Sequence, residues 1–209
     1  MLFSTIEFVV FFVVVLAAIT IIKNRQFQHL FLLFASFFFF YYSSNYLLIL
    51  LISSILLNFY LGKQIWKTES QHQKKILLAL SLAGNLALLG FFKYADFAIL
   101  QFNILGQELN FNPDIPFLDL ALPIGISFYT FQTITYTVDI YRGKLTPSKS
   151  LREFALFVSF FPQLVAGPIV RASEFLPQLR AKIQQYETGT RLRQIIIENP
   201  NLRLGITVM

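Results

Sequence analysis

The sequence has no cysteine and few charged residues. Without cysteine no disulfide can form, and no thiolate can act as a nucleophile or a metal ligand. Charged residues make up 13% of the chain and hydrophobic residues 56%, whereas soluble domains contain about 25% and about 45–50%. A chain this apolar would aggregate in water, so its composition favours a membrane protein.

The sequence also lacks the patterns of several common sites. It has no cluster with metal-ligand spacing, no nucleophile elbow and no phosphate-binding loop. Neither of its two histidines, His29 and His72, has a carboxylate or serine spaced to orient it. The basic residues lie in short segments between apolar runs, which argues against nucleic acid despite the net charge of +6. We therefore predict no catalytic residue, no metal site and no bound cofactor within this chain.

Five apolar runs are candidates for membrane-spanning helices, which need about 20 mainly apolar residues each. The runs cover residues 4–22, 28–42, 45–61, 76–92 and 118–140. The first run follows no basic segment and ends without a small-residue cleavage site, so it is interpreted as a span and not as a signal peptide. The sequence predicts an all-α, polytopic membrane protein with about five transmembrane helices, forming a single domain over residues 1–209.

The charges between these runs alternate in sign. Lysine and arginine follow the first, third and fifth runs, whereas residues 93–119 carry four acidic residues and one lysine. Positively charged connections stay in the cytoplasm. The alternation predicts an N-terminus outside, five crossings, and a cytoplasmic position for everything after Arg142.

Residues 157–171, FVSFFPQLVAGPIVR, are apolar but contain helix-breaking positions. Pro162, Gln163, Gly167 and Pro168 would leave backbone groups without partners in lipid. Such backbone is tolerated only inside protein or along a wet cavity. Lys149 and Arg152 precede the segment, and Arg171 ends it, so both of its ends are basic. We predict a re-entrant segment that lines a cavity open to the cytoplasm; the alternative is a sixth span kinked by proline.

The fifth run is unusually polar for a membrane helix. Tyr129, Gln132, Tyr136 and Asp139 recur at spacings of three and four residues and so share one face. Asp139 and Arg142 are spaced to form an ion pair. Polar groups within spans usually face a bundle interior or a pathway. The pattern leaves two interpretations open: the wall of a substrate channel, or hydrogen bonding between helices with an interfacial anchor.

Two long stretches carry a family resemblance. LPIGISFYTFQTITYTVDIYRG at residues 122–143 and FFPQLVAGPIVRASEFLPQL at residues 160–179 resemble the membrane-bound O-acyltransferase family, in its alginate O-acetylation branch. The opening MLFSTIEFVVFF and FFKYADF at residues 91–97 are similar to the same branch. The resemblance implies helices around a central tunnel, with a catalytic histidine, acting as general base, on a later helix. Nothing in this chain matches that histidine. The resemblance therefore implies a truncated N-terminal part of an incomplete fold, inactive on its own.

The resemblance also implies a reaction and its participants. An O-acyl group, expected to be O-acetyl, would pass from a cytoplasmic donor, acetyl-CoA or another acyl thioester, toward an extracytoplasmic polysaccharide or cell-wall glycan. The location would be the bacterial inner membrane, and the expected partners are the lipid bilayer, the donor and an extracytoplasmic acceptor or acetyltransferase protein. Arg142, Lys144 and Arg171 would attract the donor's phosphates, unless they serve only to set topology. The candidate tunnel residues are Tyr129, Gln132, Tyr136, Asp139, Arg142, Pro162, Gln163, Gly167, Pro168 and Arg171.

Two other functions fit parts of the same pattern. Broken apolar segments and a polar span also occur in transporters and channels. A truncated, inactive gene product is the third alternative. A histidine on a later apolar helix would favour the enzyme, and an inverted repeat of the first five spans would favour a transporter.

Overall fold

The computed structural model describes residues 5–109, 111, 114–166 and 170–185, and all regular elements in that part are helical. The prediction of an all-α chain is confirmed. The elements, in order, are α1 (Ile6–Ile21), α2 (Arg25–Ser44), the short 3-10 helix η1 (Asn45–Leu47), α3 (Leu48–Lys67), α4 (Gln71–Glu108), α5 (Ile126–Tyr141), α6 (Leu151–Ser159), α7 (Phe161–Ala166) and α8 (Ala172–Gln185).

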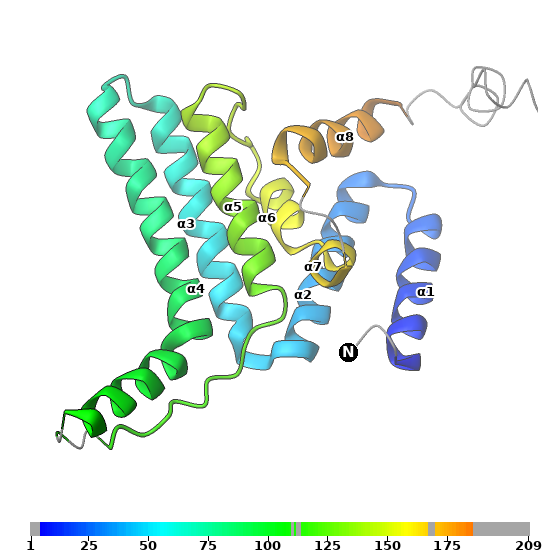
Figure 1. The fold of residues 1–209 in the computed structure, drawn as a ribbon. Coiled ribbons are helices and arrows are strands. Elements are labelled where there is room, and N and C mark those ends of the chain that lie inside the picture. Colours follow the sequence, from blue (N-terminus) through cyan, green and yellow to red (C-terminus); the bar gives the residue numbers. More distant parts are fainter. Residues whose placement is uncertain (1–4, 110, 112–113, 167–169, 186–209) are drawn as a thin grey trace, which may run out of the picture.

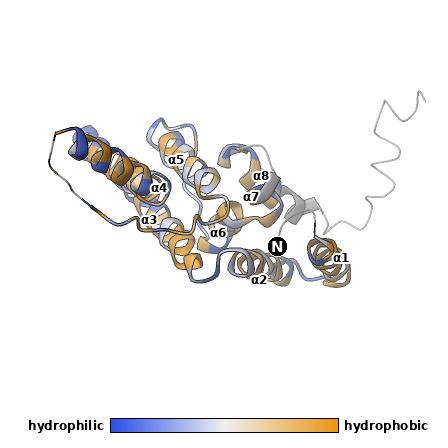
Figure 2. Cartoon of the chain, turned by 60° about the horizontal axis from the view of Figure 1, so that its bottom comes forward, coloured by the Kyte–Doolittle hydropathy of each residue, from blue (hydrophilic) through white to orange (hydrophobic). Residues whose placement is uncertain are grey.

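The first five α-helices run alternately up and down in Figure 1. Two helical stretches, Gln26–Lys67 and Gln71–Glu108, are long and apolar enough to cross a membrane, while Ile6–Ile21 is a shorter apolar helix. The first stretch contains two helices, α2 and α3. The chain reverses direction between them at Asn45, which takes a positive φ of 52°. Figure 2 shows hydrophobic residues around the outside of α1 and α4 as well as in the centre.

The connections that carry the basic residues lie toward one end of the bundle. These are the turns between α1 and α2, between α3 and α4, and between α5 and α6, all at the upper end in Figure 1. The reversal at η1 and the long segment before α5 lie at the opposite end. The alternation of charge along the sequence therefore matches an alternation of chain direction in space.

Two expected boundaries are wrong. α4 was expected to end at residue 92, but it continues to Glu108 because no proline occurs before Pro113 and the intervening residues are good helix formers. α5 begins at Ile126 and not at residue 118, because Pro123 and Gly125 immediately precede it. Residues 93–119 are thus half helix, and the lower part of α4 turns away from the bundle (Figure 1).

A buried polar network joins the centres of α3, α4 and α5. Asn85 Nδ2 donates to Asn58 Oδ1 over 2.8 Å, and Asn58 Nδ2 donates back to Asn85 Oδ1 over 3.2 Å. Ser81 donates to Asn58 Oδ1 over 2.8 Å and its hydroxyl shares a hydrogen bond with that of Thr137 over 3.1 Å, and Thr133 donates to Asn85 Oδ1. In an apolar surrounding an unpaired amide would be costly. Reciprocal bonding therefore fixes the three helices in one relative register.

Small residues let the same helices approach closely. A Cβ on Gly62 of α3 would lie 2.9 Å from Tyr136 Cε1 and 3.0 Å from Ile140 Cδ1, both on α5. A Cβ on Gly84 of α4 would lie 3.2 Å from Leu57 of α3. Close backbone approach at small residues is a common way for membrane helices to pack. Glycine thus brings α3 and α5 near enough for the polar network to form.

Phenylalanines join α1 and α2 to the α7 segment. The Phe161 ring of α7 lies 5.1 Å from that of Phe11 and 5.7 Å from that of Phe39, measured between centroids. The Phe8 ring packs against the same group, 5.9 Å from Phe39. Phe161 and Phe39 are fully buried. This cluster holds α1 against the rest of the bundle.

We predict that Ser81→Ala in the full-length protein lowers the free energy of unfolding by about 1 kcal/mol, because Asn58 Oδ1 loses a hydroxyl donor and Thr137 loses a hydroxyl partner inside the bundle. Asn85→Leu removes several bonds together and should cost about 1–3 kcal/mol. Denaturant titration of the detergent-solubilised protein measures both losses.

The matched control is Ser53→Ala, since Ser53 is exposed and bonds only to the Ile49 carbonyl of its own helix. Its free energy of unfolding should stay within about 0.5 kcal/mol of the parent. Equal losses for Ser81→Ala and Ser53→Ala would show that the network does not stabilise the bundle.

Candidate functional site at the break between α6 and α7

α6 enters the bundle from the end at which the basic connections lie. Its first turn is capped by Ser150, whose side chain accepts from Glu153 N over 3.5 Å. The preceding Ser148 N donates to Tyr136 Oη over 3.1 Å, which ties the connection to α5. All six residues from Phe154 to Ser159 are buried. α6 is therefore a core helix on every side.

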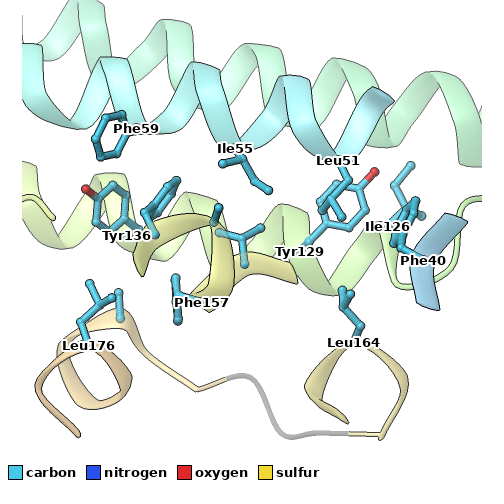
Figure 3. Close-up of a cluster of buried hydrophobic side chains, with 14 of the residues drawn as sticks. Phe40, Leu51, Ile55, Phe59, Ile126, Tyr129, Tyr136, Phe157, Leu164 and Leu176 are labelled. Atoms are coloured by element: carbon cyan, nitrogen blue, oxygen red, sulfur yellow. The ribbon is translucent and has the colours of Figure 1, made fainter. Parts of the chain in front are cut away.

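The segment runs inward and then returns. α6 has nine residues, which extend over about 13 Å and fall well short of the roughly 30 Å hydrocarbon core. Figure 3 shows Leu164 of α7 at the Tyr129 end of α5 and Leu176 of α8 at the Tyr136 end. The Phe175 ring of α8 lies 5.5 Å from Phe157. α8 thus lies back alongside α6, which agrees with the predicted reversal; Gly167 and Pro168 lie outside the described residues.

Gly125 fixes how deep α7 reaches. It precedes α5 with a φ of 69°, a conformation in which a side chain is strained. A Cβ there would also lie 3.0 Å from the backbone carbonyl oxygen of Leu164. The glycine of the LPIG sequence therefore has two roles: it starts α5 and it admits the α7 backbone.

The amide of Gln132 bonds to the backbone at the end of α6. Its Nε2 donates to the Phe157 carbonyl over 3.0 Å. That carbonyl belongs to the last turn of α6, where intrahelical partners run out. The amide of Phe161, four residues on, instead donates to Ser36 Oγ of α2 over 3.4 Å. Side chains from α5 and α2 thus complete the hydrogen bonding at the break.

The side-chain amide of Gln132 also lies close to Gln163, the glutamine of the FFPQ sequence. Gln132 Nε2 lies 3.5 Å from Gln163 Oε1, and Gln163 is half-buried beside the half-buried Pro162. Gln132 is fully buried, and its Oε1 has no hydrogen-bond partner among the described residues. The structure therefore brings together two predicted site residues that are 31 positions apart.

The other predicted site residues of α5 become more exposed toward its C-terminal end. Tyr129 and Tyr136 are fully buried, and the Tyr136 ring lies 4.3 Å from that of Phe154. Tyr129 Oη lacks a hydrogen-bond partner within the described part of the chain. Asp139 is half-buried, whereas Arg142 follows the last helical residue and is exposed. The predicted shared face is correct for its three inner members.

The predicted ion pair between Asp139 and Arg142 is wrong. The structure records none between these two described residues, because α5 ends at Tyr141 and the Arg142 side chain points into solvent. Lys144 and Arg171 are exposed as well. All three cations are therefore accessible to a ligand outside the bundle.

Of the two interpretations left open by the sequence of α5, the structure shows hydrogen bonding between helices, and the channel wall stays a prediction. Thr133 and Thr137 bond to α4, which is hydrogen bonding between helices. Tyr129 and Gln132 instead keep polar atoms without partners among the described residues. A buried polar atom without a partner is rare and calls for an explanation.

Sequence reasoning missed two groups of buried polar residues. Asn58 and Asn85 were not singled out, although asparagine within an apolar run is a signal of interhelical bonding. Ser159 was also missed: it ends α6, is fully buried, and its Oγ has no partner in the described structure. His29 is also buried, near the start of α2.

Chemically, the break offers amide and hydroxyl groups in an apolar surrounding. These groups can bind and orient a ligand that carries both a donor and an acceptor. Within the described residues, no group of three or more histidine, cysteine, aspartate or glutamate residues could hold a metal ion. The arrangement of these groups is suited to positioning a polar ligand.

Comparison with known proteins finds several curated relatives. The chain is 36% identical over 188 residues to a peptidoglycan O-acetyltransferase of Helicobacter pylori, covering 78% of this chain and 35% of that protein. It is 33% identical over 205 residues to a probable alginate O-acetylase of Pseudomonas putida, covering 95% and 42%. A probable alginate O-acetylase of Pseudomonas aeruginosa is 32% identical over 179 residues, covering 85% and 34%.

The chain thus spans between a third and about two fifths of the length of these relatives. No family model matches the chain. No solved structure matches it either.

We predict that Gly125→Ala in the full-length protein lowers stability by more than the matched change Gly143→Ala. Both glycines have a positive φ, near 70°, but nothing lies within 4 Å of a Cβ on Gly143. Gly143→Ala should therefore cost only the backbone strain of about 1–2 kcal/mol. Gly125→Ala should add the displacement of Leu164, measured by thermal unfolding in detergent. Equal losses would mean that α7 does not depend on this contact.

Proposed function

We propose that this chain is part of an enzyme that O-acetylates an extracytoplasmic glycan. The chain belongs to the membrane-bound O-acyltransferase family, in the branch of the alginate O-acetylases and the peptidoglycan O-acetyltransferase. The observation that carries the proposal is similarity to O-acetylases along 95% of the chain. The acceptor class follows from the relatives, which act on alginate or peptidoglycan by name.

The chemistry of the proposed reaction assigns roles to parts of the protein. An acceptor hydroxyl oxygen attacks the carbonyl carbon of an acyl thioester, a C–O bond forms, the C–S bond breaks, and the thiolate leaves. A general base takes the hydroxyl proton. We assign that base to a histidine elsewhere in the full-length enzyme. The present chain would supply walls that bind and orient the donor.

The α6–α7 break is the proposed inner wall of the donor path. Its support is the reversal of the chain inside the bundle and the buried amide of Gln132 beside the half-buried amide of Gln163. Irregular backbone at membrane depth fits such a path, since it is tolerated where it is buried in protein or lines a wet cavity. The exposed cations Arg142, Lys144 and Arg171 would attract the phosphates of a donor such as acetyl-CoA at the cytoplasmic opening.

The proposed orientation places the basic connections in the cytoplasm and the N-terminus outside a bacterial inner membrane. We predict that a membrane-impermeant maleimide labels a cysteine at Glu108, the end of α4, in intact spheroplasts, and labels a cysteine at Lys67, the end of α3, only in inside-out vesicles. The chain has no native cysteine to confuse the result. Labelling of both positions from the same face would contradict the topology.

Gln163→Leu tests the proposed donor path directly. The change removes a half-buried amide whose oxygen lies near Gln132, while the side chain keeps a similar volume. We predict that acetyl transfer by the full-length enzyme falls about tenfold, equivalent to losing roughly 1.4 kcal/mol of donor positioning. The purified yield should stay normal. Radiolabelled acetate incorporated into glycan measures the transfer.

The control is Gln64→Leu, an exposed glutamine of α3, which should leave transfer unchanged. Full transfer in Gln163→Leu would remove this break from the donor path. Loss of transfer with a parallel loss of yield would show a structural role only.

A further inference from the structure

α4 is too long for one membrane crossing. At about 1.5 Å per residue its 38 residues extend over about 57 Å, whereas the hydrocarbon core measures about 30 Å. The helix begins at the end of the bundle that carries the basic connections, with Lys74 and Lys75 in its first turns. Some 20 residues from Ile76 onward would cross the core. The helix from about Ala95 therefore lies at or beyond the opposite interface.

We call residues 91–109 the arm: they comprise the last residues of the crossing and the part of the helix beyond it. The lower part of α4 carries the chain away from the bundle (Figure 1). A return segment, residues 114–122, runs back along it. Asn103 binds the return segment with both ends of its amide: Nδ2 donates to the Ile115 carbonyl over 2.9 Å, and Oδ1 accepts from Ile115 N over 3.2 Å. Asp96 Oδ1 accepts from Leu118 N over 2.7 Å. Arm and return segment are thus one bonded unit.

The opposite face of the arm is an apolar stripe. Asp96 and Asn103 are seven residues apart and share one face. About half a turn around the helix from them, exposed apolar side chains recur every three or four residues. Phe97, Leu100 and Ile104 are exposed as well, on the flank between this stripe and Asp96. The stripe itself consists of Phe91, Tyr94, Ala98, Phe102, Leu105 and Leu109. Its large members are each more than half exposed.

We infer that this stripe lies in the lipid bilayer, with the arm along the interface opposite the basic connections. The depth of the arm along α4 places it where hydrocarbon meets headgroups. Three members of the stripe, Phe91, Tyr94 and Phe102, are aromatic, as is typical of residues at that level. An amphipathic helix with such a face buries it about 5–10 Å below the headgroups.

The charge of the arm specifies the kind of lipid contact. Its charged residues are one lysine, Lys93, and two acids, Asp96 and Glu108. Binding to anionic lipid needs a basic polar face, which the arm lacks. Burial of apolar surface would therefore hold the arm, and anionic lipid would not strengthen the contact.

The anchored arm would also fix the start of α5. The return segment leads directly to Pro123 and Gly125, where α5 begins and Leu164 of α7 makes its contact. The position of this end of the site relative to the membrane surface then follows from the depth of the arm. The inference rests on the chain being a membrane protein and does not depend on the proposed acyl transfer.

Spin labelling of the full-length protein in phosphatidylcholine vesicles tests the inference. Labels are placed on single cysteines at Phe102 and Leu105 in the stripe, and at the exposed Gln107, close to the face of Asp96 and Asn103, as the control. The stripe labels should collide with oxygen and be shielded from a water-soluble nickel chelate, at a depth of about 5–10 Å. The control label should show the reverse. A label at Ala98 replaces either stripe label that lowers the yield.

Four results would contradict the inference. Nickel access at every position would place the arm in water. Exclusion of both reagents from the stripe would mean that another part of the protein covers it. Spin–spin broadening that disappears on dilution with unlabelled protein would mean that a second copy covers it. Adding phosphatidylglycerol should leave the depth unchanged, and a deeper stripe in that lipid would contradict the assigned apolar contact. Acetyl transfer, assayed separately, reports on the proposed function alone.

Discussion

The reciprocal bonding of Asn58 and Asn85 is the constraint on which the rest of the bundle depends. In an apolar surrounding these amides have no water to bond, so they must meet each other and the hydroxyls of Ser81 and Thr133, and Ser81 in turn bonds to Thr137. Sliding any one of α3, α4 and α5 along its neighbours would break several bonds together. Gly62 allows the close approach that makes the network reachable. α5 therefore has one defined height and rotation.

The side of α5 that faces α6 and α7 differs from the side that bonds to α4. On the side that faces α4, Thr133 and Thr137 have partners and Thr130 Oγ1 has none among the described residues; on the other side, Tyr129 and Gln132 also keep polar atoms without such partners. α6 and α7 meet this second side, with Gln132 and Ser36 completing the hydrogen bonds at their break. The proposed donor path would therefore have a rigid support, which accurate positioning of a reacting group requires.

The sequence predicted the helical class, the sites of reversal and the unusual nature of residues 157–171, because apolar run length, proline and glycine act locally. It also placed Tyr129, Gln132 and Tyr136 on one shared face, since helical periodicity fixes that relation. It was wrong at the end of α4, where helix propensity continues beyond the apolar run, and at Asp139 and Arg142, which the end of α5 separates.

What the sequence determined by itself is the set of helices and their alternation, since backbone groups in lipid must be satisfied within each helix whatever its neighbours are. Only the tertiary structure decided which polar residues meet. Asn58 is 27 positions from Asn85, and Gln132 is 31 positions from Gln163. Contacts of this kind depend on the relative heights and rotations of whole helices, which are set by packing at glycines such as Gly62 and Gly125 and by side chains on several elements together. No single stretch of sequence contains that information.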